Sequence, residues 1–145
     1  METKELEAIF QKYLGIPYRH GGRDMNGVDC LGLVYLIYRD CGIEIPDNDG
    51  REYTKDWYKV EPDRYLKGIR RYGKEVPLDS LKPLDLVYFK MGRAVTHTGI
   101  MVDEKSFIHV LEGTRVHISR LNFKWERRLA GARRFIEADV ERKES

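Results

Sequence analysis

The chain has 145 residues, a length that suits one domain with its own hydrophobic core. Apolar residues make up 41% of the sequence and charged residues 34%, a composition typical of globular rather than disordered proteins. The net charge of +2, from 26 basic and 24 acidic residues, argues against a broad face that binds nucleic acid.

A local cluster of arginines near the C-terminus is interpreted as a solvated strand-and-turn surface. It comprises Arg127, Arg128, Arg133 and Arg134.

The first residues include acidic side chains and no apolar run follows them, so we expect no secretory signal peptide. No stretch is long enough to cross a bilayer. We therefore expect a protein that is made in the cytoplasm and has no membrane partner. The two cysteines, Cys30 and Cys41, are too few for a disulfide framework. On one helix they would lie about 16 Å apart, too far to pair with each other.

Apolar residues recur with helical spacing between residues 3 and 14, which predicts an amphipathic helix with Thr3 as its N-cap. A glycine-rich loop follows. A second helix is predicted to begin near Cys30. It is apolar nearly all round, as in a buried helix, and Gly42 is expected to end it. Residues 47–80 are polar with scattered aromatics, and we expect short helices and loops there.

The rest of the sequence predicts five strands separated by turns. They cover residues 84–89, 98–102, 107–111, 116–118 and 132–136. Helices followed by an antiparallel run of strands give an α+β fold, and we expect residues 1–145 to form one domain.

Cys30 stands where the glycine-rich loop ends and the apolar helix begins. A thiol is nucleophilic as the thiolate, and a helix N-terminus favours that anion with unpaired N–H groups and a partial positive charge. The same N–H groups can stabilise an oxyanion. The sequence therefore offers Cys30 as a nucleophile, against the alternative of an inert buried cysteine.

A nucleophilic cysteine needs an imidazole that takes its proton. His97 and His109 lie six residues on either side of Asp103, so a hairpin centred there would place them opposite each other. One ring would then orient the other, as a triad requires. His117 mirrors His109 about Gly113 and is a rival for the third position. Each histidine alone has the alternative of a surface or satisfied core residue.

Cys30, His97 and His109 are also residue types that bind zinc. However, no Cys-x-x-Cys or His-x-x-x-His spacing supports a metal site, and no fourth ligand is evident. We expect neither a metal nor a cofactor.

Five separate segments together resemble the NlpC-type cysteine peptidases, which hydrolyse bacterial cell walls. The segments are Tyr13 to Gly22, Gly27 to Val34, Lys82 to Phe89, His97-Thr98-Gly99-Ile100-Met101-Val102 and Ile108-His109-Val110. They occur in the order of the family over roughly residues 10–112.

The resemblance implies a papain-like fold, in which the Cys30 helix packs on an antiparallel sheet of about five strands. It implies that Cys30, His97 and His109 form a triad that cleaves peptide bonds in peptidoglycan stem peptides. It also assigns an oxyanion-stabilising hydroxyl to Tyr18. Asp29 would recognise a substrate amine or cap the Cys30 helix, and the two roles are compatible.

Two residues depart from the family pattern. Leu31 stands where serine usually follows the nucleophile in a polar substrate subsite, and this departure questions a preference for a free N-terminal amine. Leu84 stands where glycine is common, which we expect to affect only a turn.

Family members that lack a signal peptide and a wall-binding module include phage tail components. We therefore hypothesise a phage or prophage tail-associated hydrolase with tail proteins as partners, acting at the cell wall. The alternatives are an inactive structural or binding module of a tail or wall assembly, and a cysteine acyltransferase or amidase.

Overall fold

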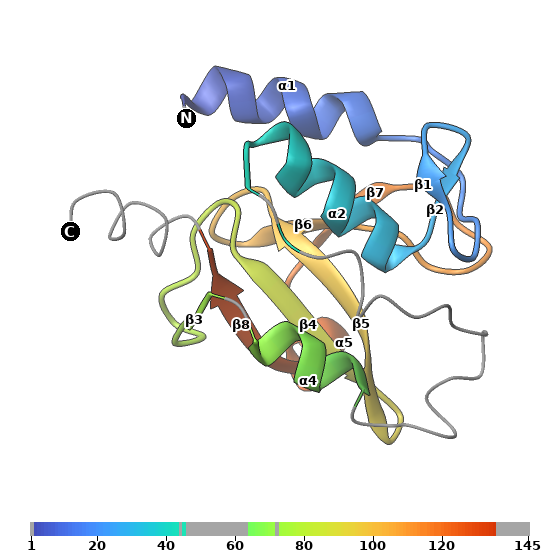
Figure 1. Cartoon of the computed structure of the whole chain (residues 1–145). Helices are drawn as coiled ribbons and strands as arrows, with labels where there is room; N and C mark the ends of the chain where they lie inside the picture. Colours follow the sequence, from blue (N-terminus) through green and yellow to red (C-terminus); the bar gives the residue numbers. More distant parts are fainter. Residues whose placement is uncertain (1, 44, 46–63, 72, 136–145) are drawn as a thin grey trace.

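The computed structural model describes residues 2–43, 45, 64–71 and 73–135 (Figure 1). The described helices are α1 (Thr3–Tyr13), α2 (Cys30–Asp40), α4 (Arg64–Arg70) and α5 (Phe123–Arg128). The described strands are β1 (Arg23–Asp24), β2 (Gly27–Val28), β3 (Lys74–Glu75), β4 (Leu86–Met91), β5 (Ala94–Met101), β6 (Ser106–His109), β7 (His117–Arg120) and β8 (Leu129–Arg134). Residues 47–63 and 72, predicted to be short helices and loops, lie outside the described part of the chain.

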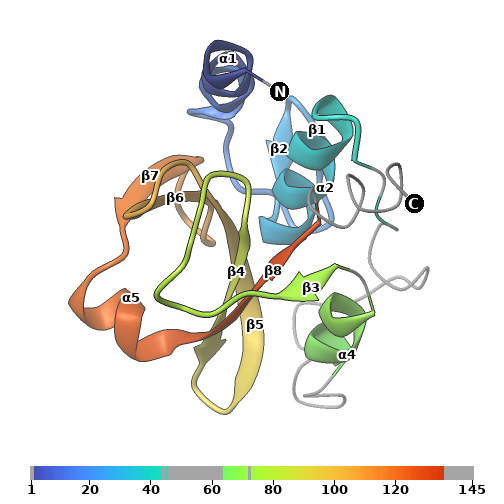
Figure 2. The ribbon, with the colours of Figure 1, turned by 90° about the vertical axis from the view of Figure 1, so that its left-hand side faces the viewer.

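Six strands form one antiparallel sheet in the order β3-β8-β4-β5-β6-β7, and β1 pairs with β2 in a separate hairpin. Helix α1 packs on α2, and α2 packs on β5, so the N-terminal helices form a layer over the sheet (Figure 1). Helix α5 contacts β4, and Figure 2 shows it on the other side of β4 from α2. The architecture is the α+β fold that the sequence predicts.

Side chains of the central strands alternate between two apolar clusters, as strand geometry requires. Leu86 and Ile100 belong to the cluster that includes α1 and α2. The residues that follow them, Val87 and Met101, belong to the cluster that includes Trp125 of α5. The central strands are thus buried on both faces, which explains their nearly continuous apolar sequences.

The two N-terminal helices lie where the sequence predicts them. Helix α2 begins at Cys30, and Gly42 follows its end with a φ of 77°, the left-handed conformation common after a helix C-terminus. Helix α1 has Glu2 at its N-cap position, with no side-chain hydrogen bond. The prediction of Thr3 as the cap is therefore wrong, because Thr3 is already the first helical residue.

Every predicted strand overlaps an observed one, although the ends differ. Strand β5 begins at Ala94, four residues before the predicted strand at 98–102. The sheet has six strands rather than about five, because β3 pairs with β8 at its edge. The two residues of β3 are exposed and charged, so no apolar alternation marks them in the sequence.

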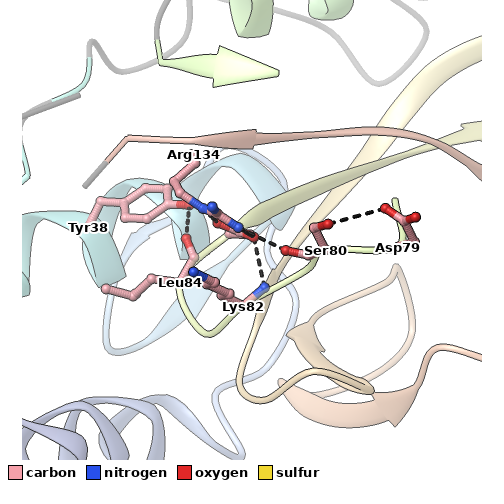
Figure 3. A network of polar contacts seen from close by, with 7 residues as sticks. Tyr38, Asp79, Ser80, Lys82, Leu84 and Arg134 are labelled. Atoms are coloured by element: carbon pink, nitrogen blue, oxygen red, sulfur yellow. Dashed lines mark hydrogen bonds and ion pairs between the residues drawn. The ribbon is translucent and has the colours of Figure 1, made fainter. Parts of the chain in front are cut away.

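Leu84 forms a turn just before β4, in which the Asp85 N–H donates to the Lys82 carbonyl oxygen at 3.1 Å. Its φ of 75° lies in the left-handed region that favours glycine. The Leu84 side chain is buried. The backbone carbonyl oxygen of Leu84 accepts a 2.8 Å hydrogen bond from the Tyr38 hydroxyl of α2 (Figure 3). Leu84 therefore also ties the sheet to the helical layer, beyond the turn expected from the sequence.

Two of the C-terminal arginines are held in ion pairs. Arg134 donates to both carboxylate oxygens of Asp85 at 2.7 Å. It also donates to the Ser80 carbonyl oxygen (Figure 3). Arg133 donates to Glu75 at 2.9 Å. Their side chains are only 13% and 11% exposed, so the interpretation of a solvated basic surface is wrong for these two residues.

The glycine-rich loop lies directly against the first turn of α2. A Cβ atom added to Gly32 would lie 2.0 Å from the Gly22 carbonyl oxygen and 2.8 Å from Nη1 of Arg23. A Cβ atom added to Gly22 would lie 2.2 Å from the Gly27 carbonyl oxygen. Glycine at these positions is what allows the loop backbone to approach the helix that begins at Cys30.

Replacing Gly32 by alanine should lower the free energy of unfolding by about 1–3 kcal/mol, because the new methyl group overlaps a backbone carbonyl. Urea denaturation of both proteins measures this difference. Gly68→Ala in α4 is the matched control. A Cβ atom there meets nothing within 4 Å, so this change should stabilise by up to about 1 kcal/mol. Equal effects of the two substitutions would contradict the proposed close approach.

Candidate active site

Cys30 is the first residue of α2, and its thiol lies against β5. The Sγ atom is 3.8 Å from the Thr96 carbonyl oxygen. The register of β4 and β5 shifts at Thr96. Lys90 pairs with Val95 and Phe89 pairs with His97, so Thr96 has no partner residue in the register. The cysteine thus contacts the strand at an irregularity, one residue before His97.

Asp29 joins the loop, α2 and an arginine. One carboxylate oxygen accepts hydrogen bonds from the Gly32 N–H and from Nη1 of Arg23, both at 2.8 Å. The other oxygen accepts from the Gly21 N–H, also at 2.8 Å. The residue is 4% exposed. It is therefore the N-cap of α2, one of the two roles considered from the sequence.

His97 and His109 form a buried hydrogen-bonded pair. The distance from Nε2 of His97 to Nδ1 of His109 is 2.9 Å, and the two residues are 3% and 0% exposed. The observed register pairs Ile100 with Ile108, so the hairpin is centred one residue beyond Asp103. The predicted direct pairing of the two histidines is therefore wrong, and they meet diagonally on one face of the sheet.

Gly99 provides the space for this diagonal contact. A Cβ atom at this position would lie 3.3 Å from Cβ of His109 and 2.7 Å from a ring carbon of Phe107. Without a side chain at residue 99, His109 can lie across the strand towards His97. The glycine of the His97-Thr98-Gly99-Ile100 segment thus has a packing role.

Aromatic rings enclose the histidine pair. The Trp125 ring centroid lies 5.6 Å from that of His97 and 5.0 Å from that of His109. Phe89 lies beside His97, and Phe107 lies beside His109, at centroid distances of 5.7 Å and 4.3 Å. The enclosure holds both imidazoles in a largely apolar environment.

The second nitrogen of His109 is also engaged, since its Nε2 lies 2.7 Å from Oγ of Ser119. His117 pairs with His109 in the register, as predicted, and their ring centroids are 4.5 Å apart. Its Nδ1 donates to the Arg115 carbonyl oxygen at 2.6 Å. Of the two rivals for the third position, His109 is the one hydrogen-bonded to His97.

Leu31 and Tyr18 lie near the cysteine. Leu31 and Cys30 pack partly buried against Tyr88 and Val95. Tyr18 is held through its N–H, which donates to the Thr114 carbonyl oxygen, and through a bridge to β2. Burial and nearby acidic groups raise the pKa of Tyr18 to about 12, so its hydroxyl keeps the proton that it would donate.

A sequence model of the NlpC/P60 family matches residues 15–134. The chain belongs to the NlpC/P60 family. It is 27% identical to the "Probable endopeptidase NlpC homolog" of Haemophilus influenzae, over 94% of this chain and 64% of that protein. It is 30% identical to the "Murein DD-endopeptidase MepS/Murein LD-carboxypeptidase" of Escherichia coli K12, over 88% of this chain and 60% of that protein. The chain thus spans somewhat more than half the length of these relatives.

The fold comparison agrees with the family. The crystal structure of an NlpC/P60 family protein from Bacillus cereus matches with a TM-score of 0.72 and 26% identity, over 93% of this chain and 40% of that chain. The papain-like fold implied by the sequence resemblance is therefore confirmed.

The described part of this NlpC/P60 chain has no cluster of three or more His, Cys, Asp or Glu side chains placed to hold a metal ion. Among the described helices, none has the length and apolar character needed to cross a bilayer. Cys30 and Cys41 form no disulfide with each other, as predicted from their spacing.

Burial keeps the histidine pair neutral. Burial, with smaller contributions from the charges of His117 and Arg128, lowers the pKa of His97 from 6.5 to about 3. Burial is also the main cause that lowers the pKa of His109, followed by the charge of His97. At neutral pH both rings are therefore uncharged. Each has one N–H group and one bare nitrogen, and the bare nitrogen can accept a proton.

The sequence interpretation missed two residues of the site, Ser119 and Trp125. Ser119 is two residues beyond His117, so the two side chains lie on the same face of the strand. This spacing could have identified Ser119 from the sequence. Trp125 lies in α5, a short helix for which the sequence interpretation offered no pattern.

The free energy of unfolding should fall as the pH drops below about 6.5. The unfolded histidines take up protons near that pH, whereas the buried rings stay neutral until about pH 3. Acid therefore favours the unfolded state between these values, by up to about 1.4 kcal/mol per pH unit for each ring. Chemical denaturation at several pH values measures the slope.

His109→Asn removes one of the two buried imidazoles and should reduce this slope. A free energy of unfolding that is flat over the same range, or an identical slope in both proteins, would contradict the neutral buried pair.

Proposed function

We propose that the protein is a cysteine endopeptidase that hydrolyses peptide bonds in peptidoglycan stem peptides. The observation that carries the proposal is the buried hydrogen bond between His97 and His109. His97 lies on β5, the strand whose Thr96 carbonyl oxygen is 3.8 Å from the Cys30 sulfur. Membership of the NlpC/P60 family and the murein endopeptidase similar to this chain support the substrate class.

In the proposed acylation step, His97 accepts the thiol proton of Cys30 as sulfur attacks the substrate carbonyl carbon. The proton goes to Nδ1 of His97, because Nε2 is hydrogen-bonded to His109. The carbon–nitrogen bond then breaks, and the imidazolium returns the proton to the leaving amine. A thioester joins Cys30 to the acyl part of the stem peptide.

Deacylation reverses these roles. His97 takes a proton from water, the resulting hydroxide attacks the thioester, and the Cys30 sulfur leaves with a proton from the imidazolium. His109 keeps the His97 ring in one orientation and one tautomer through both steps. The apolar enclosure disfavours a lasting imidazolium, which is consistent with proton transfer that accompanies each bond change.

The proposed oxyanion site has two donors. The Cys30 backbone N–H lies at the N-terminus of α2, where the helix dipole favours negative charge. The Tyr18 hydroxyl is the second donor, and its raised pKa keeps it protonated over the working range of a peptidase.

Substrate selection is assigned to residues 29 and 31. Leu31 presents an apolar side chain where the family pattern has a serine, which favours a subsite with weaker preference for a free N-terminal amine. Asp29 already binds Gly21, Gly32 and Arg23, so its main proposed task is to hold the loop against α2. Recognition of a substrate amine by its carboxylate stays a prediction.

We infer that the site of action is the cell wall, since the substrate class is found there. The relatives named above are bacterial proteins. Association with a phage or prophage tail stays a prediction from the sequence, as does a single domain over residues 1–145.

Purified protein should release stem-peptide fragments from peptidoglycan, and Cys30→Ala should reduce the rate by about a thousandfold or more. Chromatography and mass spectrometry of the soluble products measure the release. Cys41→Ala is the matched control, because burial raises the pKa of that thiol to about 11 and the mechanism does not use it. This control should keep wild-type activity.

Equal release by wild type and Cys30→Ala on several wall chemistries would contradict the peptidase proposal. Binding of peptidoglycan by the wild type without release of fragments would instead favour the alternative of an inactive binding module.

A further inference from the structure

The histidine pair continues into a third polar group on the neighbouring strand. Oγ of Ser119 lies 2.7 Å from Nε2 of His109, at the end of the ring opposite His97. In the register of β6 and β7, Ser119 faces Phe107 and His117 faces His109. The serine therefore reaches His109 diagonally, on the same face of the sheet.

We propose that Ser119 is a positioning residue that supports the productive tautomer of both histidines, by giving Nε2–H of His109 an acceptor. The inference rests on the proposed function for the meaning of that tautomer. The hydrogen-bond chain itself depends only on the distances among His97, His109 and Ser119.

The direction of the chain follows from the proposed role of His97. To accept the thiol proton at Nδ1, a neutral His97 must carry its own hydrogen on Nε2. That hydrogen is donated to Nδ1 of His109, 2.9 Å away, so Nδ1 of His109 must be bare. The hydrogen of His109 is then on Nε2, where Oγ of Ser119 is the acceptor at 2.7 Å.

The opposite arrangement would disable the base. If Nδ1 of His109 carried the hydrogen, Nε2 of His97 would have to be bare in order to accept it. The remaining hydrogen of His97 would then occupy Nδ1, the nitrogen assigned to the thiol. The Ser119 hydroxyl can donate to a bare Nε2 of His109 or accept from Nε2–H. Its contribution to the productive arrangement is the acceptor, because without it the buried Nε2–H would have no partner there.

The other polar ring nearby is not aligned for this task. His117 lies beside His109 at a centroid distance of 4.5 Å, with the two rings tilted by 52°, and its Nδ1 donates to the Arg115 carbonyl oxygen. Ser119 is the group that the structure places at hydrogen-bond distance from Nε2 of His109. A hydroxyl suits the position because its own hydrogen can rotate away and leave a lone pair for the imidazole.

Ser119→Ala should lower kcat for release of stem-peptide fragments about ten- to a hundredfold with little change in KM, since Ser119 is proposed to act through His109. Ser119→Thr keeps the hydroxyl and should restore kcat to within about threefold of wild type. Arg120→Ala, at the next and exposed position of β7, is the matched control and should leave kcat unchanged.

A second measurement reads the tautomer without substrate. The imidazole ¹⁵N chemical shifts of His109 should report a protonated Nε2 and a bare Nδ1 in wild type and in Ser119→Thr. In Ser119→Ala they should report a mixture of tautomers, or the reverse one. Amide NMR spectra of the variants establish that each is folded.

The proposal is overturned if Ser119→Ala keeps the wild-type tautomer, or if it changes the tautomer and keeps the wild-type kcat. It is also overturned if Ser119→Thr loses as much activity as Ser119→Ala while folded. A wild-type protein that releases no fragments would contradict the proposed function alone, because the tautomer is still measured by NMR.

Discussion

The hydrogen bond between the buried rings of His97 and His109 is the interaction on which the proposed chemistry of this chain depends. Burial lowers the pKa of both rings and so keeps them neutral, and the short contact between them fixes how each ring is turned. Trp125 covers both rings and supplies much of the enclosure. The same desolvation that opposes charge on His97 preserves the form of the imidazole that can take a proton from a thiol.

The cysteine is placed by backbone packing. Gly22 and Gly32 let the loop lie against α2, and Asp29 ties the loop to the first turn of the helix. The helix then presents Cys30 to the Thr96 carbonyl oxygen, where the β5 register is irregular. The proposed nucleophile and the proposed base thus come from two layers of the fold, which are in contact where Cys30 meets Thr96, the residue before His97.

Much of this arrangement can be predicted from the sequence, for identifiable reasons. Helical periodicity and the glycine-to-apolar transition placed α1 and the start of α2, and the symmetry of two histidines about Gly113 gave the β6–β7 register. The β5–β6 register was not predictable from symmetry, because the turn centre lies one residue beyond Asp103. Ser119 and β3 carry no apolar pattern, and their places depend on tertiary contacts.

Trapping of the acyl-enzyme tests the central claim most directly. Rapid acid quenching of the wild type with soluble muropeptides, followed by mass mapping, should find the acyl part of the stem peptide on Cys30 and none on Cys41. His97→Ala should form this adduct at least about a hundredfold more slowly, since general base catalysis contributes that much or more. An adduct on another residue, or one that forms at the wild-type rate in His97→Ala, would contradict the account.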